Sequence, residues 1–234
     1  IDGVTMQARV LEFLEGETLS GHLSPDAVRA IGTLAATVDL ALGDSEFNRQ
    51  ELAALGFNPT GVLPVVPDFS HLDLESNDVF AKEFDDEWTN ILFVGRVIPN
   101  KRLEDVIRYF HAYQRHFNPR SRLLLVGSYG GYEKYLAMLQ QLIARLGASN
   151  VHFTGHVTDA ELTAYYEIAD LFLCASAHEG FCVPIVESFY KQVPVVAYAA
   201  TAVPATMDGA GVRYTTQEPL EVAFGGSGAQ RPRI

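Results

Sequence analysis

The chain of 234 residues carries a net charge of −12, which argues against nucleic acid as a main partner and against strong attraction to anionic lipid. Hydrophobic residues make up 48% and charged residues 20%, as in ordinary globular domains. Only two cysteines are present, there is no pattern of a secretion signal, and no apolar run approaches the roughly 20 residues of a membrane span, so we expect a cytoplasmic protein.

The first third of the chain predicts the last part of one Rossmann-like domain. An apolar strand is expected at 38–45, followed by a helix over 45–57 with Ser45 as its cap and Gly56 as its end. A second strand is expected at 60–66. Two complete domains of this kind need roughly 300 residues. We therefore assign residues 1–67 to a partial N-terminal domain and residues 68–89 to a polar linker.

From residue 90 onward, strand-like and helix-like segments alternate. Strands are expected at 90–96, 121–127, 151–155, 171–176, 193–198 and 211–215, and helices at 103–117, 132–147, 159–169 and from Pro184. Near-continuous apolar strands separated by helices predict an α/β fold, with a doubly wound parallel sheet over residues 90–220. The glycine-rich end at 221–234 has no apolar period and is expected to be disordered.

The segment after the strand at 171–176 contains the strongest functional pattern. It lies at the carboxyl edge of the predicted sheet, where open α/β sheets bind ligands. No Ser, Thr, Asp or Asn directly precedes Pro184, so the helix start is uncapped, and its free N–H groups and dipole favour an anion. Glu179 lies in the loop and Glu187 one turn inside the helix. The candidate backbone donors are Gly180, Phe181, Cys182 and Val183.

The strand at 90–96 supplies positive charge at the same edge. Gly95 and Arg96 end that strand, and Lys101 follows in the next loop. Two cations and an uncapped helix start suit a diphosphate, while carboxylates accept hydrogen bonds from sugar hydroxyls. A ligand with a hydroxyl-bearing group on each side of a phosphate group fits this pattern, and a nucleotide sugar has that shape.

Four segments, at 93–110, 123–131, 151–176 and 178–198, resemble the nucleotide-binding domain of glycosyltransferase family 4 in order and spacing. The members of that family are retaining enzymes of the GT-B fold, and residues 38–57 resemble the end of its acceptor domain. The resemblance implies that Glu179 contacts the donor sugar, that Arg96 and Lys101 hold the diphosphate, and that Glu187 binds the ribose. It also implies that a loop contacts the base. The residues of that loop are Gly155, His156 and Val157.

The resemblance therefore implies an enzyme of carbohydrate biosynthesis that transfers a hexose, with retention, from a UDP- or GDP-sugar to a sugar, lipid or small-molecule acceptor. Glu179, Arg96 and Lys101 are the expected catalytic residues, and no cofactor or metal is required. The sequence lacks the first half of the acceptor domain, so the alternative is a non-catalytic nucleotide-sugar-binding fragment or pseudoenzyme. We expect the chain alone to transfer little sugar and to self-associate through its incomplete N-terminal domain.

Other interpretations stay open at this point. Glu179 could only order its loop, Glu187 could only complement the helix dipole, and Arg96 and Lys101 could be solvated surface charges. Cys182, beside a helix start, could be a nucleophile with a lowered pKa. A nucleotide-binding regulator with the same fold is a third possibility. The seven histidines show no metal-ligand spacing, and the absence of a G-x-G-x-x-G fingerprint argues against a dinucleotide enzyme.

Overall fold

The computed structural model describes residues 25–75, 84 and 86–215. Its N-terminal part contains α2 (Pro25–Ala35), β1 (Ala41–Gly43), α3 (Glu46–Ala54) and β2 (Thr60–Val62). β1 and β2 pair in parallel, so the predicted strand–helix–strand order is confirmed, with shorter strands than expected. The Ser45 hydroxyl accepts a hydrogen bond from the Asn48 N–H at 3.3 Å and caps α3 as predicted.

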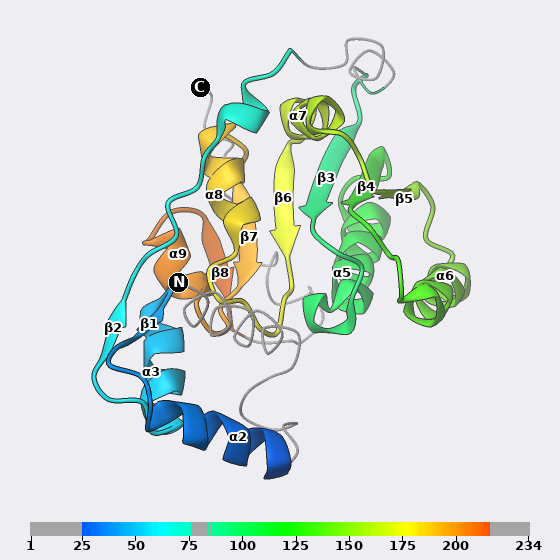
Figure 1. Ribbon diagram of the computed structural model, residues 1–234. Helices are drawn as coiled ribbons and strands as arrows, with labels where there is room; N and C mark the ends of the chain where they lie inside the picture. Colours follow the sequence, from blue (N-terminus) through cyan, green and yellow to red (C-terminus); the bar gives the residue numbers. More distant parts are fainter. Residues whose placement is uncertain (1–24, 76–83, 85, 216–234) are drawn as a thin grey trace.

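The remaining described residues form the doubly wound domain (Figure 1). Its strands are β3 (Thr89–Val94), β4 (Ser121–Val126), β5 (Val151–Gly155), β6 (Leu171–Cys174), β7 (Val195–Tyr198) and β8 (Val212–Tyr214). Its α-helices are α5 (Leu103–His116), α6 (Glu133–Leu146), α7 (Asp159–Glu167), α8 (Val183–Tyr190) and α9 (Val203–Met207). Two short 3-10 helices, η1 (Ser70–Leu72) and η2 (Pro99–Lys101), accompany them.

The strand order is β5-β4-β3-β6-β7-β8, and every pair is parallel. Numbered from the first strand of the sheet, this is the 3-2-1-4-5-6 order of a Rossmann sheet. The predicted fold class is confirmed. The order reverses between β3 and β6, which lie side by side in the middle of the sheet (Figure 1).

Helices cover both faces of the sheet, and side chains of β3 contribute to the core on each face. Ile91 and Phe93 face a core formed with α5 and α6, whereas Leu92 faces a second core formed with α7, α8 and α9. Because successive strand residues point to opposite faces, a strand buried on both sides reads as a continuous apolar run. This explains why the sequence "NILFV" has no alternation.

The described part of the predicted linker, residues 68–75, packs against the doubly wound domain. Leu72 of η1 is fully buried in the core beneath α7 and α8, and the Lys191 ammonium donates to its carbonyl at 3.1 Å. The predicted linker also includes residues 76–83 and 85, which lie outside the described residues, as do residues 1–24 and the predicted tail at 221–234. The domain boundaries stay predictions.

Several apolar side chains of the N-terminal part are exposed. Leu63 is 63% exposed and Val66 is 90% exposed, and Leu40, Leu42 and Val62 are also open to solvent.

In the described ranges, no helix combines the length and the apolar character that crossing a membrane requires.

A close approach of two glycines fixes the ends of β3 and β4. A Cβ atom added to Gly127 would lie 2.0 Å from the Gly95 carbonyl oxygen, and Gly127 has a φ of +143°. We predict that Gly127→Ala lowers the free energy of unfolding by at least about 2 kcal/mol, because steric overlap and backbone strain each cost about 1–3 kcal/mol. Chemical denaturation measures the change. Gly130→Ala, whose Cβ would meet only the Ser128 hydroxyl at 3.5 Å, is the matched control. Equal stability of the two variants would contradict the prediction.

Candidate functional site

The loops that follow β3 and β6 meet at the point where the strand order reverses. The chain leaves β3 toward α5 on one face of the sheet and leaves β6 toward α8 on the other face. The Ala177 N–H donates to the Asn100 carbonyl at 2.8 Å and joins the two loops directly. A crevice between diverging loops at such a position is where open α/β sheets bind their ligands.

An ion pair lies in this crevice. The Lys101 ammonium donates to both oxygens of Glu179, at 2.7 and 2.8 Å, and Glu179 is 8% exposed. Burial alone would lower the pKa of Lys101, but the charge of Glu179 and these hydrogen bonds outweigh it and raise that pKa. Lys101 and Glu179 therefore form a buried ion pair and are not solvated surface charges.

The backbone around Glu179 is fixed by the segment that leads into α9. The Thr201 hydroxyl accepts from the Glu179 N–H at 2.9 Å and donates to the Glu179 carbonyl at 2.8 Å. The Thr206 hydroxyl donates to the Phe181 carbonyl. These bonds hold the carboxylate in place without using its oxygens, which stay available to Lys101 and to a ligand.

The start of α8 is uncapped, as the sequence predicts. Cys182 is the N-cap residue, has no side-chain cap bond and adopts a left-handed conformation with φ 69°. Gly180 and Phe181 precede it in the loop, and Val183 is the first residue of α8. The pair of Lys101 and Glu179 therefore lies beside an uncapped helix N-terminus.

The two cysteines contact each other beneath this loop. The hydrogen bond between the two thiols raises the pKa of Cys182, and burial raises it further. The same bond lowers the pKa of Cys174, which accepts it. A nucleophilic Cys182 with a lowered pKa is therefore contradicted.

Glu187 faces the interior one turn into α8. The residue is 6% exposed. Its carboxylate accepts a hydrogen bond from the Tyr166 hydroxyl at 2.8 Å and lies 3.1 Å from Nε2 of His71. Burial raises the pKa of Tyr166 well above 10, so this hydroxyl keeps its proton and donates. Nδ1 of His71 lies 2.9 Å from the Asp68 carbonyl, so both ring nitrogens face oxygen atoms. Glu187 is therefore more than a surface charge near a helix start.

Arg96 is on the same edge of the sheet but apart from the ion pair. Its side chain is exposed, and Cζ lies 5.7 Å from the ring centroid of Tyr132. The guanidinium of Arg102, the residue after Lys101, pairs with Asp105 in the first turn of α5. Arg102 has φ 50°, a left-handed conformation that glycine adopts at no steric cost.

The proposed base-contacting loop follows β5, two strands away from β3. Gly155 is buried with φ +75°, and a Cβ there would lie 3.6 Å from the Tyr129 ring. His156 is exposed, and Val157 packs partly against the core beneath α7 and α8. The structure places this loop on the same edge as the ion pair, with β4 between β5 and β3.

The N-terminal part of the chain touches the loop of Glu179 through Gly180. A Cβ on Gly180 would lie 2.8 Å from a carboxylate oxygen of Asp44 and 3.5 Å from the amide oxygen of Asn48. Burial raises the pKa of Asp44. His178 packs edge-to-face on Phe47, with ring centroids 5.8 Å apart. The absence of a side chain at position 180 thus lets the two parts of the chain approach closely.

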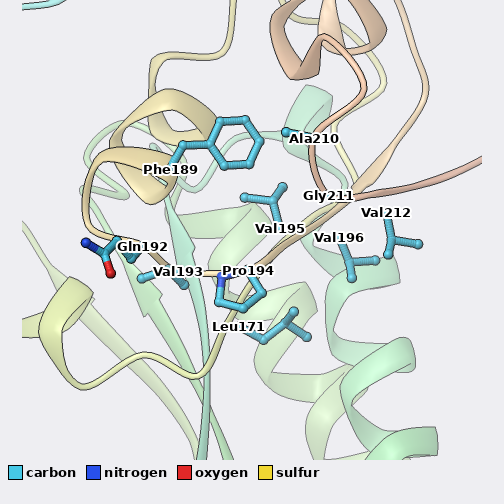
Figure 2. Close-up of a pocket in the computed structure, with 10 residues that line it drawn as sticks. All are labelled: Leu171, Phe189, Gln192, Val193, Pro194, Val195, Val196, Ala210, Gly211 and Val212. Atoms are coloured by element: carbon cyan, nitrogen blue, oxygen red, sulfur yellow. The ribbon is translucent and has the colours of Figure 1, made fainter. Parts of the chain in front are cut away.

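A second hollow lies at the opposite edge of the sheet. It is a groove of about 630 Å³ among the amino ends of β6, β7 and β8. Figure 2 shows the residues that line it. Gln192 is the one polar side chain among the residues that line it, all of which the structure describes. An apolar groove without cations cannot bind a diphosphate, so the crevice between the β3 and β6 loops is the better candidate site.

Sequence reasoning missed the residues that support the site. Tyr166 and His71 hold Glu187, Thr201 holds the backbone of Glu179, and Asp44 borders Gly180. Each comes from an element remote in sequence, and no local motif marks it.

The family model described as glycosyl transferases group 1 matches residues 75–216, which is more than half of the 234 residues. The chain belongs to the group 1 glycosyltransferases. The chain is 30% identical over 122 residues to O-antigen chain mannosyltransferase B of Escherichia coli. It is 26% identical over 173 residues to mannosylfructose-phosphate synthase of Agrobacterium fabrum. The matches cover 52% and 71% of this chain but 31% and 36% of those relatives, so the chain spans about a third of their length.

Solved structures show the same fold. Anabaena HepE in complex with UDP-glucose matches this chain with a TM-score of 0.74 at 23% identity, covering 89% of this chain and 59% of that one. Sucrose-phosphate synthase from Thermosynechococcus elongatus matches with a TM-score of 0.71 at 17% identity, covering 88% and 52%. Both likenesses agree with the parallel Rossmann-like sheet of the GT-B fold.

The buried ion pair leads to a prediction about stability. Lys101→Met should lower the free energy of unfolding by about 3–5 kcal/mol, because it leaves the Glu179 carboxylate buried without a partner. Lys101→Met combined with Glu179→Gln should cost less than the sum of the single changes, with a coupling free energy of about 0.5–3 kcal/mol. Denaturant titrations at pH 7 provide the double-mutant cycle. Because Glu179 raises the pKa of Lys101 above 10.5, this contribution should be lost only as the pH rises beyond that value.

The control is the exposed pair Arg120 and Glu87, whose charged atoms lie 3.5 Å apart. Its coupling free energy should stay below about 1 kcal/mol, as for exposed ion pairs in general. Equal coupling in the two cycles would show that the pair of Lys101 and Glu179 behaves as an ordinary surface contact.

Proposed function

We propose that this chain is the donor-binding part of a retaining family 4 glycosyltransferase, which transfers a hexose from a UDP- or GDP-sugar to an acceptor hydroxyl. The observation that carries the proposal is the buried pair of Lys101 and Glu179 beside the uncapped start of α8. A cation and free amides attract the diphosphate, and the carboxylate next to them accepts hydrogen bonds from the sugar.

Each charged group has a distinct role in the proposed reaction. Lys101, the exposed Arg96 side chain and the backbone amides of residues 180–183 stabilise negative charge on the departing diphosphate. Glu179 orients the hexose through its hydroxyls, Glu187 accepts from the ribose hydroxyls, and the 155–157 loop contacts the base. Neither a metal nor a cofactor is required, because protein groups neutralise the leaving group.

Lys101 and Glu179 change partners when the donor binds. In the absence of the donor each neutralises the other, as the bonds at 2.7 and 2.8 Å show. The diphosphate then offers Lys101 a stronger anion, and the hexose hydroxyls offer Glu179 neutral donors in its place. Lys101 and Glu179 are thus both in position before the donor binds, and neither charge is buried without a partner.

Retention requires the acceptor to attack the face of the sugar from which the diphosphate leaves. The bond from the anomeric carbon to the diphosphate oxygen breaks, and a bond from that carbon to the acceptor oxygen forms on the same side. The acceptor hydroxyl then lies next to the departing phosphate oxygen, which takes its proton. No protein base is needed for this step.

The relatives support a hexose donor. Two of them are named for mannosyl transfer or mannosylfructose phosphate synthesis, and the Anabaena structure contains UDP-glucose. The acceptor is a sugar, a lipid or a small molecule of carbohydrate biosynthesis, and we place the reaction in the cytoplasm. The exposed apolar side chains of the N-terminal part, such as Leu63 and Val66, favour self-association.

Nucleotide binding tests the proposed site. Calorimetry should detect binding of UDP or GDP to the folded chain, and Glu187→Gln should weaken it about 10- to 100-fold, as expected for a lost hydrogen bond to a charged group. Tyr166 can still donate to the glutamine, so the fold should persist. Glu167→Gln at the end of α7, whose carboxylate pairs with Lys191, is the control and should bind normally. Absence of heat with both nucleotides would refute the site.

The stereochemistry of the product tests retention. Incubation with UDP-glucose or GDP-mannose and a panel of acceptors should yield a glycoside with the anomeric configuration of the donor, read by proton NMR coupling constants. Turnover with inverted configuration would refute the retaining mechanism. Donor binding without turnover would favour the alternative of a non-catalytic nucleotide-sugar-binding fragment.

A further inference from the structure

Three potential metal ligands converge beneath the start of α8. The thiol of Cys174, a carboxylate oxygen of Glu179 and the thiol of Cys182 all lie within 4.8 Å of one another, and all three residues are buried. Within the described residues, these three side chains are the one group of His, Cys, Asp or Glu whose ligand atoms lie close enough together to hold a metal ion. None of the three ligands in the pattern C-x4-E-x2-C is a histidine, so a search for histidine spacing does not find this group.

The ligands are held by three different elements. Cys174 is the last residue of β6, Cys182 is the N-cap of α8, and the backbone of Glu179 is bonded in both directions to the Thr201 hydroxyl. A site whose ligands are fixed before the metal arrives loses little conformational entropy on binding. Ser176 is also buried, with its hydroxyl 3.3 Å from the sulfur of Cys174, where it can donate to a thiolate.

The charges of such a site balance. When a divalent ion binds, the two thiols release their protons, and the thiolates and the Glu179 carboxylate together carry three negative charges. The ion contributes two positive charges and the Lys101 ammonium one, so the buried group is neutral. Lys101 can keep its bond to one Glu179 oxygen while the other oxygen binds the metal. Neutrality matters because an uncompensated buried charge costs several kcal/mol.

We propose that Cys174, Glu179 and Cys182 form a binding site for a thiophilic divalent cation of the Zn²⁺ class. Two sulfur ligands and one oxygen ligand select such an ion over Mg²⁺ or Ca²⁺, which prefer oxygen alone. Three protein ligands leave one position of a tetrahedral zinc ion for water or for a ligand oxygen. The site differs from the expectation that this chain has no metal site.

A bound ion would compete with the donor sugar. This consequence rests on the proposed function, in which Glu179 accepts hydrogen bonds from the hexose. An ion on one Glu179 oxygen removes that acceptor, so zinc-loaded protein should bind UDP-glucose less tightly than metal-free protein does. Sugar-free UDP, which does not use Glu179, should lose less affinity than UDP-glucose. A metal ion bound at this site would therefore inhibit binding of the donor sugar.

Metal titration of the full chain tests the site without nucleotide. The protein is kept reduced with a phosphine, both thiols are counted with a thiol reagent, and Cd²⁺ or Zn²⁺ is added. We expect one equivalent of Cd²⁺ to bind, with ultraviolet absorption from cadmium–thiolate bonds, and Zn²⁺ to displace it. Cys182→Gly should weaken binding at least about 100-fold, more than the 10- to 100-fold typical of losing an outer hydrogen-bond partner. Glycine accepts φ 69° freely, so this variant should fold.

Two further variants complete the test. Cys174→Ala should show the same loss as Cys182→Gly, whereas Glu187→Gln, which changes a buried glutamate inside α8 that is not one of the three ligands, should bind Cd²⁺ like the unmodified chain. The proposal is overturned if protein with two free thiols binds no Cd²⁺, or if Cys182→Gly binds Cd²⁺ with unchanged affinity. A failure of UDP-glucose to bind at all would count against the proposed function and leave the titration decisive for the metal site.

Discussion

The divergence of the chain after β3 and β6 is the constraint on which the site depends. The two strands are neighbours and parallel, but one continues into α5 on one face of the sheet and the other into α8 on the opposite face. Helices on both faces leave the space between the two loops uncovered. Lys101 from one loop and Glu179 from the other meet in that space. The ion pair and the uncapped start of α8 therefore lie close together because of the strand order.

Much of this arrangement could be predicted from the sequence. Continuous apolar strands between amphipathic helices predicted the doubly wound sheet, and Ser45 was recognisable as a cap because helix starts follow local rules. Pro184, with no capping residue immediately before it, predicted the uncapped start of α8. These signals depend on neighbours within a few residues, and the structure agrees with them.

What escaped prediction depends on contacts between distant segments. The buried bonds of Glu187 involve Tyr166 on α7 and His71 on η1, and no periodicity relates those positions. The meeting of the two cysteines requires knowing that the loop after β6 folds back over its end. The backbone of Arg102 also escaped prediction, because a left-handed conformation, which glycine adopts most easily, is not indicated by an arginine in the sequence.

The two hydrogen bonds between the Thr201 hydroxyl and the backbone of Glu179 connect the loop that carries Glu179 to the segment before α9. That segment follows β7 and contributes no group to the proposed ligand contacts, yet it sets where the carboxylate stands. Mutations between β7 and α9 can therefore shift the carboxylate by fractions of an ångström while every ligand-contacting residue stays the same. Two members of the family could thus differ in the hexose that they accept through the framework behind the site, and a comparison confined to contact residues would overlook the cause.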